Sequence, residues 1–93
     1  MIKVKVNGPK AWVTFTFSPQ EQTDQVALSG EWNAWEEEPM KLKKNGEFYL
    51  TKVIPTGDVY QFGYKVDGNA WIPEETCKST PSPFFSTNSV LEL

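Results

Sequence analysis

Two of the four tryptophans in this sequence, Trp35 and Trp71, are its best candidates for a chemical task. An exposed indole ring offers a flat apolar surface on which the C–H face of a sugar ring can stack, while nearby polar groups bond the hydroxyl rim. Trp35 comes after a predicted strand and beside acidic residues, and Trp71 follows a tight turn, so we expect both rings to be exposed. The chemistry that this favours is the binding of a sugar.

The other two tryptophans are expected to be structural. Trp32 continues the inward register of Val26 and Leu28, so we expect its ring in the core. Trp12 lies on the opposite face of its strand from the inward-facing side chains, and we expect it to cover the N-terminal strand rather than to contact a ligand.

The residue types needed for catalysis or metal binding are scarce. The chain has no histidine and one cysteine, Cys77, which excludes an activated Cys/His nucleophile, an internal disulfide and a zinc cluster. The acidic run at Glu36, Glu37 and Glu38 is expected to be a solvated face, and Asp67 to serve an Asp-Gly turn. We therefore expect no enzyme activity, no catalytic residue, no metal and no cofactor.

Composition and charge narrow the possible partners. The 93 residues suffice for one domain, which we expect to span residues 1–93. The net charge of −3 and the absence of arginine argue against nucleic acid. No apolar run approaches the roughly 20 residues of a membrane-spanning helix, and residues 1–6 alternate apolar and basic types, unlike a signal peptide. We expect no membrane partner, and either a cytoplasmic protein or a domain cut from a larger one.

The elements that must position these residues are strands, because the dominant period of the sequence is two. About seven short strands separated by turns predict an all-β, immunoglobulin-like sandwich of antiparallel strands. The strands are expected at residues 3–6, 11–17, 25–29, 40–43, 47–54, 59–66 and 89–93.

The connections carry clear turn signals. Asn45-Gly46 predicts a hairpin between the fourth and fifth of these strands, and residues 55–58 a turn. Residues 30–39 are expected to be irregular. Residues 73–83 contain three prolines and few apolar residues, so we expect a loop there.

Two motifs together make a family resemblance. The first is Gly30-Glu31-Trp32-Asn33-Ala34-Trp35, and the second, about 30 residues later, runs from Tyr60 through Val66-Asp67-Gly68 to Trp71. In this order the sequence resembles the family 48 carbohydrate-binding modules. That family includes the glycogen-binding domain of the AMP-activated protein kinase β subunit and the N-terminal early-set domains of isoamylases and glucan-branching enzymes.

The resemblance implies a set of sugar-contacting residues. Trp35 and Trp71 match the family's two platform tryptophans, and Phe84, Ser86 and Asn88 match an apolar residue, a hydroxyl and an asparagine that precede the last strand. Two positions depart from the pattern. Gly63 stands where glycogen binders carry a lysine, with Lys65 on the same face as a candidate replacement. The turn before Trp71 is also one residue longer than in the family, because Asn69 and Ala70 stand where the family has a single residue.

The function that the resemblance implies is non-catalytic binding of α-1,4-glucan, such as glycogen, starch or maltooligosaccharide, on exposed tryptophans. The alternative is an early-set interaction domain that packs on a partner, such as a glucan-active enzyme or a kinase, without binding sugar. Burial of Trp35 and Trp71, or a wide separation between them, would favour the alternative.

Overall fold

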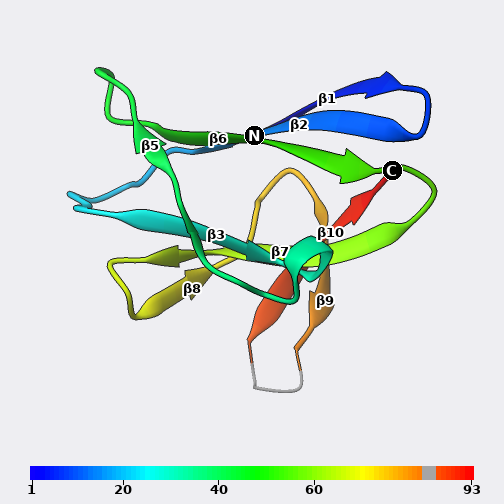
Figure 1. The fold of residues 1–93 in the computed structure, drawn as a ribbon. Coiled ribbons are helices and arrows are strands. Elements are labelled where there is room, and N and C mark those ends of the chain that lie inside the picture. Colours follow the sequence, from blue (N-terminus) through cyan, green and yellow to red (C-terminus); the bar gives the residue numbers. More distant parts are fainter. Residues whose placement is uncertain (83–85) are drawn as a thin grey trace.

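The chain folds into two antiparallel β-sheets stacked face to face (Figure 1). The computed structural model describes residues 1–82 and 86–93. The first sheet has the strand order β1 (Ile2–Asn7), β2 (Lys10–Phe17), β6 (Phe48–Pro55) and β5 (Lys41–Leu42). The second has the order β4 (Glu38–Pro39), β3 (Val26–Gly30), β7 (Val59–Val66), β10 (Thr87–Glu92) and β9 (Lys78–Pro81), and β8 (Ala70–Ile72) pairs with β7.

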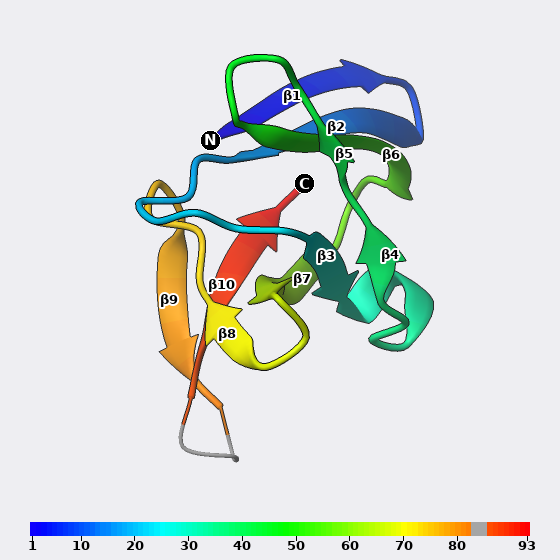
Figure 2. The ribbon, with the colours of Figure 1, turned by 90° about the vertical axis from the view of Figure 1, so that its left-hand side faces the viewer.

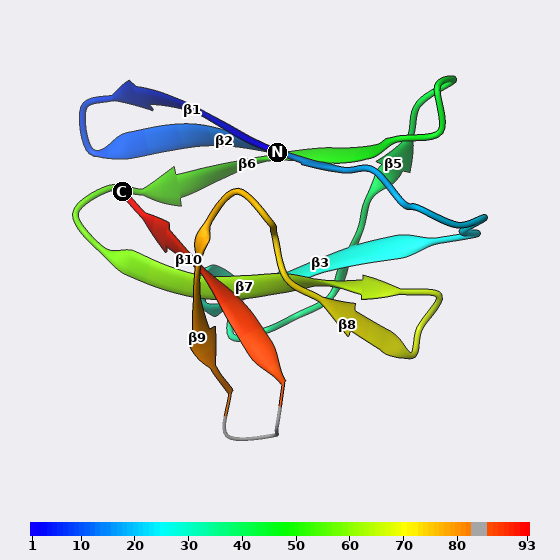
Figure 3. The same ribbon diagram turned by 180° about the vertical axis from the view of Figure 1, so that it is seen from behind.

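The predicted all-β sandwich is confirmed, but the described residues form ten strands instead of about seven. The three additional strands are β4, β8 and β9, each two to four residues long. The prediction of a loop over residues 73–83 was therefore wrong at Lys78–Pro81. This segment is the edge strand β9, and among the described residues it pairs with β10 alone (Figures 2 and 3). An edge strand needs no buried face and tolerates proline, so it leaves no alternating pattern in the sequence.

The long strands follow the predicted alternation. On β2, Val13 and Phe15 are fully buried between the sheets, whereas Trp12 is exposed on the outer face. On β7, Tyr60, Phe62 and Tyr64 point into the same core. The period-two pattern thus places one face of each long strand inside and leaves the other face for contacts with solvent.

Trp32 is half-buried and packs against this core, in line with the inward position predicted for it. It lies in the short 3-10 helix η1 (Glu31–Asn33), and its ring centroid is 5.3 Å from that of Phe15 and 5.7 Å from that of Phe62. The ring covers Gly30, where an added Cβ would come within 2.5 Å of its Cη2 atom. Glycine at position 30 is therefore a requirement of the packed indole.

Trp12 lies on the outer face of the first sheet, directly beside Lys5 of β1 and Val53 of β6. It remains 40% exposed. Trp12 therefore lies next to the N-terminal strand, as expected, while much of its surface stays in solvent.

The acidic run at residues 36–38, which we expected to be a solvated face, is exposed only in part. Glu36 is exposed and Glu37 forms an ion pair with Lys65, but Glu38 is half-buried and pairs with Lys52 at 2.6 Å. Since Glu38 belongs to β4 and Lys52 to β6, this ion pair joins the two sheets at their edge.

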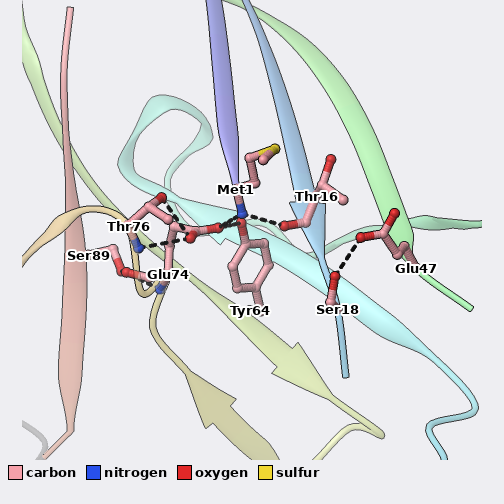
Figure 4. A network of polar contacts seen from close by, with 8 residues as sticks. All are labelled: Met1, Thr16, Ser18, Glu47, Tyr64, Glu74, Thr76 and Ser89. Carbon is pink, nitrogen blue, oxygen red and sulfur yellow. Dashed lines mark hydrogen bonds and ion pairs between the residues drawn. The ribbon is translucent and has the colours of Figure 1, made fainter. Parts of the chain in front are cut away.

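A buried carboxylate anchors the segment after β8. Glu74 is 5% exposed and accepts hydrogen bonds from the Tyr64 hydroxyl at 2.8 Å, from Thr76, and from the ammonium group of Met1 at 2.6 Å (Figure 4). Its backbone N–H donates to the Ser89 hydroxyl of β10. The carboxylate thus binds Tyr64 of β7 and Met1, which precedes β1, and the backbone N–H of Glu74 binds Ser89 of β10, so Glu74 links these three strands.

These contacts set the ionisation of their neighbours. Burial raises the pKa of Glu74, but the hydrogen bonds from the ammonium group, Thr76 and Tyr64 outweigh burial, and the pKa lies below its ordinary value of 4.5. Burial, and then the charge of Glu74, raise the pKa of Tyr64 and of the Cys77 thiol. The half-buried thiol of Cys77 therefore stays protonated, and unreactive, over the neutral pH range.

We predict that Glu74→Gln destabilises the domain by about 1–3 kcal/mol at neutral pH, because charge-assisted hydrogen bonds at a buried site are lost. A carboxylate with a lowered pKa contributes stability above its unfolded-state pKa, and that contribution disappears as the pH falls through the folded pKa. Urea unfolding from pH 7 to pH 3 should therefore show a flatter acid limb in the variant. Glu75→Gln is the matched control, because Glu75 is exposed and its side chain has no bonding partner among the described residues. Equal acid limbs for wild type and Glu74→Gln would refute the assignment.

Candidate functional site

The candidate site lies on the outer face of the second sheet, where Trp71 covers β7. Gly63 and Lys65 point outward from β7 because their neighbours Phe62 and Tyr64 point inward. Trp71 of β8 pairs with Lys65 and its ring reaches across to Gly63. A Cβ added at Gly63 would be 2.3 Å from Cζ2 of the Trp71 ring. Position 63, where the resemblance implies a lysine, thus has its outward space filled by an indole.

The indole of Trp71 is held from the side by β10. Its Nε1–H donates to the Thr87 carbonyl and to Oδ1 of Asn88, each at 3.1 Å. Asn88 is 7% exposed, and its Nδ2 donates to Oε1 of Gln61 at 3.0 Å. The ring therefore has a fixed orientation, set by Gly63 below it and Asn88 beside it.

Trp35 is positioned by a turn that reverses the chain after η1. Ala34 and Trp35 have positive φ angles of 60° and 65°, a conformation that is uncommon for residues other than glycine. The Trp35 N–H donates to the Gly30 carbonyl at 2.9 Å, and the buried Ser29 hydroxyl donates to the Trp35 carbonyl at 2.8 Å. Both hydrogen bonds tie the turn to the end of β3, so the strained backbone is compensated and the indole points to the outer face.

The two indoles form one continuous aromatic surface. Their ring centroids are 6.1 Å apart and their planes are inclined by 56°. Trp35 is 39% exposed and Trp71 is half-buried. They border an open hollow of about 430 Å³, which we call the tryptophan hollow; its lining residues are Glu31, Trp35, Gln61, Trp71, Ser82, Ser86 and Asn88.

The structure brings together four of the six residues that the sequence singled out. Trp35, Trp71, Ser86 and Asn88 all line the tryptophan hollow. Lys65 points to the same face but outside the hollow lining, and its Nζ is 3.0 Å from Glu37. Phe84 falls outside the described residues.

Sequence reasoning missed three lining residues, Glu31, Gln61 and Ser82. Gln61 could have been found, because it shares a strand face with Gly63 and Lys65. Glu31 left no such signal, since its place depends on where β3 gives way to the 3-10 helix.

A second hollow of about 430 Å³ lies between the loop at residues 18–23 and the β7–β8 turn. Its lining includes the carboxylates of Glu21, Asp67 and Glu75, and Phe17 is its one aromatic ring. Asp67 is already engaged, since its Oδ1 accepts the backbone N–H groups of Asp24 and Gln25. Among its described lining residues, this hollow therefore has no pair of adjacent aromatic rings like that of Trp35 and Trp71.

The contact between Gly63 and Trp71 gives a sharp prediction. Gly63→Ala should push the Trp71 ring out of place, cost about 1–3 kcal/mol in stability, and abolish the circular-dichroism exciton couplet of the Trp35–Trp71 pair. In the Trp71→Ala background the same substitution should have no further effect on stability, so the double-mutant cycle should give a coupling of about 0.5–3 kcal/mol. An unchanged couplet in Gly63→Ala, or additive stability losses, would contradict this packing.

Among the residues that the structure describes, no helix is long and apolar enough to span a bilayer, and no three His, Cys, Asp or Glu side chains are grouped as a metal site. No curated protein matches the chain. A family profile described as the glycogen recognition site of AMP-activated protein kinase matches residues 13–92. The match covers both tryptophan motifs and the strands of both sheets, except β1 and the start of β2. The chain therefore belongs to this family of glycogen recognition sites, the family 48 carbohydrate-binding modules, and its members are non-catalytic binding modules that recognise α-glucan.

Proposed function

We propose that the domain binds α-1,4-glucan by stacking two glucose units on Trp35 and Trp71. The observation that carries the proposal is the adjacency of the two indoles, 6.1 Å apart and open to solvent at the tryptophan hollow. Family membership supports the ligand class, and the ring pair supplies the contact surface.

The inclination of the rings suits this ligand. The α-1,4 linkage makes a glucan chain curve, so the apolar faces of successive glucose units are not parallel. Two planes inclined by 56° can each meet one such face. Each stacked tryptophan contributes about 1–3 kcal/mol by burial of apolar surface. After the cost of association, we expect a dissociation constant between about 1 μM and 1 mM.

The other four residues that the resemblance assigns or suggests for sugar contact have different roles in this proposal. Asn88 holds Trp71 and keeps one Nδ2 hydrogen for a sugar hydroxyl. Ser86 offers a hydroxyl from the wall of the hollow. Lys65 flanks Trp71, and we propose that it approaches sugar units beyond the hollow. Phe84 is proposed on the family resemblance alone.

The rival function, docking on a partner protein through the same aromatic surface, has less support. It would be favoured by buried or separated indoles. Trp35 is 39% exposed, and its ring lies beside that of Trp71. The arrangement therefore supports glucan binding over protein docking at this surface.

We predict that Trp35→Ala weakens maltoheptaose binding by at least about tenfold, the equivalent of 1.4 kcal/mol of lost stacking. Isothermal titration calorimetry measures the dissociation constant. Trp12→Ala is the matched control, because Trp12 is equally exposed, at 40% against 39%, but lies on the other sheet. We expect less than about a twofold change in the control variant.

Both variants should retain the unfolding temperature of the wild type within a few degrees, since both side chains are exposed. A wild-type domain that fails to bind maltoheptaose at millimolar concentration would refute the proposed function. Equal losses in the two variants would refute the assignment to this surface.

A further inference from the structure

Glu31 and Gln61 line the tryptophan hollow but have no role in stacking. We infer that they form a donor–acceptor pair that binds two adjacent hydroxyls of one glucose unit, and that the charge of Glu31 makes the hollow select neutral over phosphorylated glucan. This inference rests on the proposed function and adds a specificity to it.

The orientation of the Gln61 amide follows from Trp71. An indole N–H can only donate, so the atom of Asn88 that faces it must be Oδ1. The Nδ2 of Asn88 then faces Gln61, and the atom of Gln61 that accepts from it must be Oε1. This leaves the Nε2 group of Gln61 with two hydrogens that have no partner among the described residues. Gln61 therefore presents a hydrogen-bond donor to the hollow.

Glu31 supplies the acceptor. It follows Gly30, the last residue of β3, which pairs with Phe62. Beyond that pair the Glu31 side chain continues the ladder, since its Oε1 accepts the backbone N–H of Gln61 at 2.6 Å. Its Oε2 has no partner in the part of the chain that the structure describes. One carboxylate oxygen thus fixes the side chain to β7, and the other is left for a ligand.

A donor and an acceptor on linked residues match the chemistry of a sugar diol. Each hydroxyl of glucose both donates and accepts, so one can donate to Oε2 of Glu31 while its neighbour accepts from Nε2 of Gln61. The hydrogen bond to an ionised carboxylate is the stronger of the two. Position 63 has no lysine, so in this domain Glu31 and Gln61 contact the hydroxyl rim of the sugar instead.

The same carboxylate works against anionic ligands. Glu31 is the one ionisable side chain among the described residues that line the tryptophan hollow. Lys65, the lysine of β7, is paired with Glu37. A phosphate monoester carries about −1.5 to −2 charges at neutral pH, and no cation of the lining would offset its repulsion by Glu31.

The test compares maltoheptaose with a maltooligosaccharide of similar length that carries one glucose 6-phosphate unit. Calorimetric titrations at low salt should show the wild type binding the neutral sugar at least about tenfold more tightly, because screening is weak there. Glu31→Gln should bind maltoheptaose about three- to tenfold more weakly, since a charge-assisted bond becomes a neutral one. In this variant the dissociation constants of the two ligands should also differ by less than about threefold.

Glu36→Gln is the matched control, because it removes the same charge from an exposed neighbour outside the hollow. It should behave like the wild type with both ligands. Gln61→Glu keeps an acceptor for Asn88 but replaces the donor, so it should weaken maltoheptaose binding while the Trp35–Trp71 exciton couplet persists.

The outcomes separate the inference from the proposed function. If the wild type binds neither ligand, both are overturned. If the wild type binds maltoheptaose but Glu31→Gln binds it equally well and keeps the wild-type preference, the inference fails and the proposed function stands. If Glu36→Gln loses discrimination as much as Glu31→Gln, the effect belongs to the overall charge of the domain and the inference also fails.

Discussion

The close approach of the Trp71 ring to the backbone of Gly63 is the contact on which the rest of the site depends. Any side chain at position 63 would overlap the indole, so glycine is the condition for a ring lying against β7. With the ring in that place, Asn88 can accept its N–H, Gln61 can accept from Asn88, and Trp35 can lie beside it. The absence of a Cβ at position 63 thus determines where the aromatic surface lies. It also determines how the side-chain amides of Asn88 and Gln61 are oriented.

An indole also packs against a glycine on the inner face of the same sheet. Gly30 of β3 and Gly63 of β7 occupy neighbouring rows of the strand pair, and each is covered by an indole. Trp32 covers Gly30 from inside the sandwich, and Trp71 covers Gly63 from outside. The inner ring packs against the hydrophobic core, whereas the outer ring contributes a surface, so the core directly supports the part of the sheet that carries the site.

The sequence was sufficient to predict the sandwich, because alternation marks the long strands, and to predict the exposed ring of Trp35. The exposure expected for Trp71 was met only in part, since its ring is half-buried against Gly63 of β7. The sequence did not reveal β4, β8 and β9, which are short and lie at edges where backbone pairing leaves no pattern of burial. It also did not reveal Glu31. The place of this carboxylate depends on the end of β3 and on a hydrogen bond to a strand 30 residues away. Properties of single strands were predictable, and contacts between distant strands were not.

The central claim is that glucan lies on Trp35 and Trp71, and the most direct test is the nuclear magnetic resonance spectrum of the four indole N–H groups during a maltoheptaose titration. The account predicts that the signals of Trp35 and Trp71 shift together with one saturable dependence on sugar concentration, while those of Trp12 and of Trp32, whose Nε1 is buried, stay in place. A shift confined to Trp12, or no shift of Trp35 and Trp71 at millimolar sugar, would contradict it.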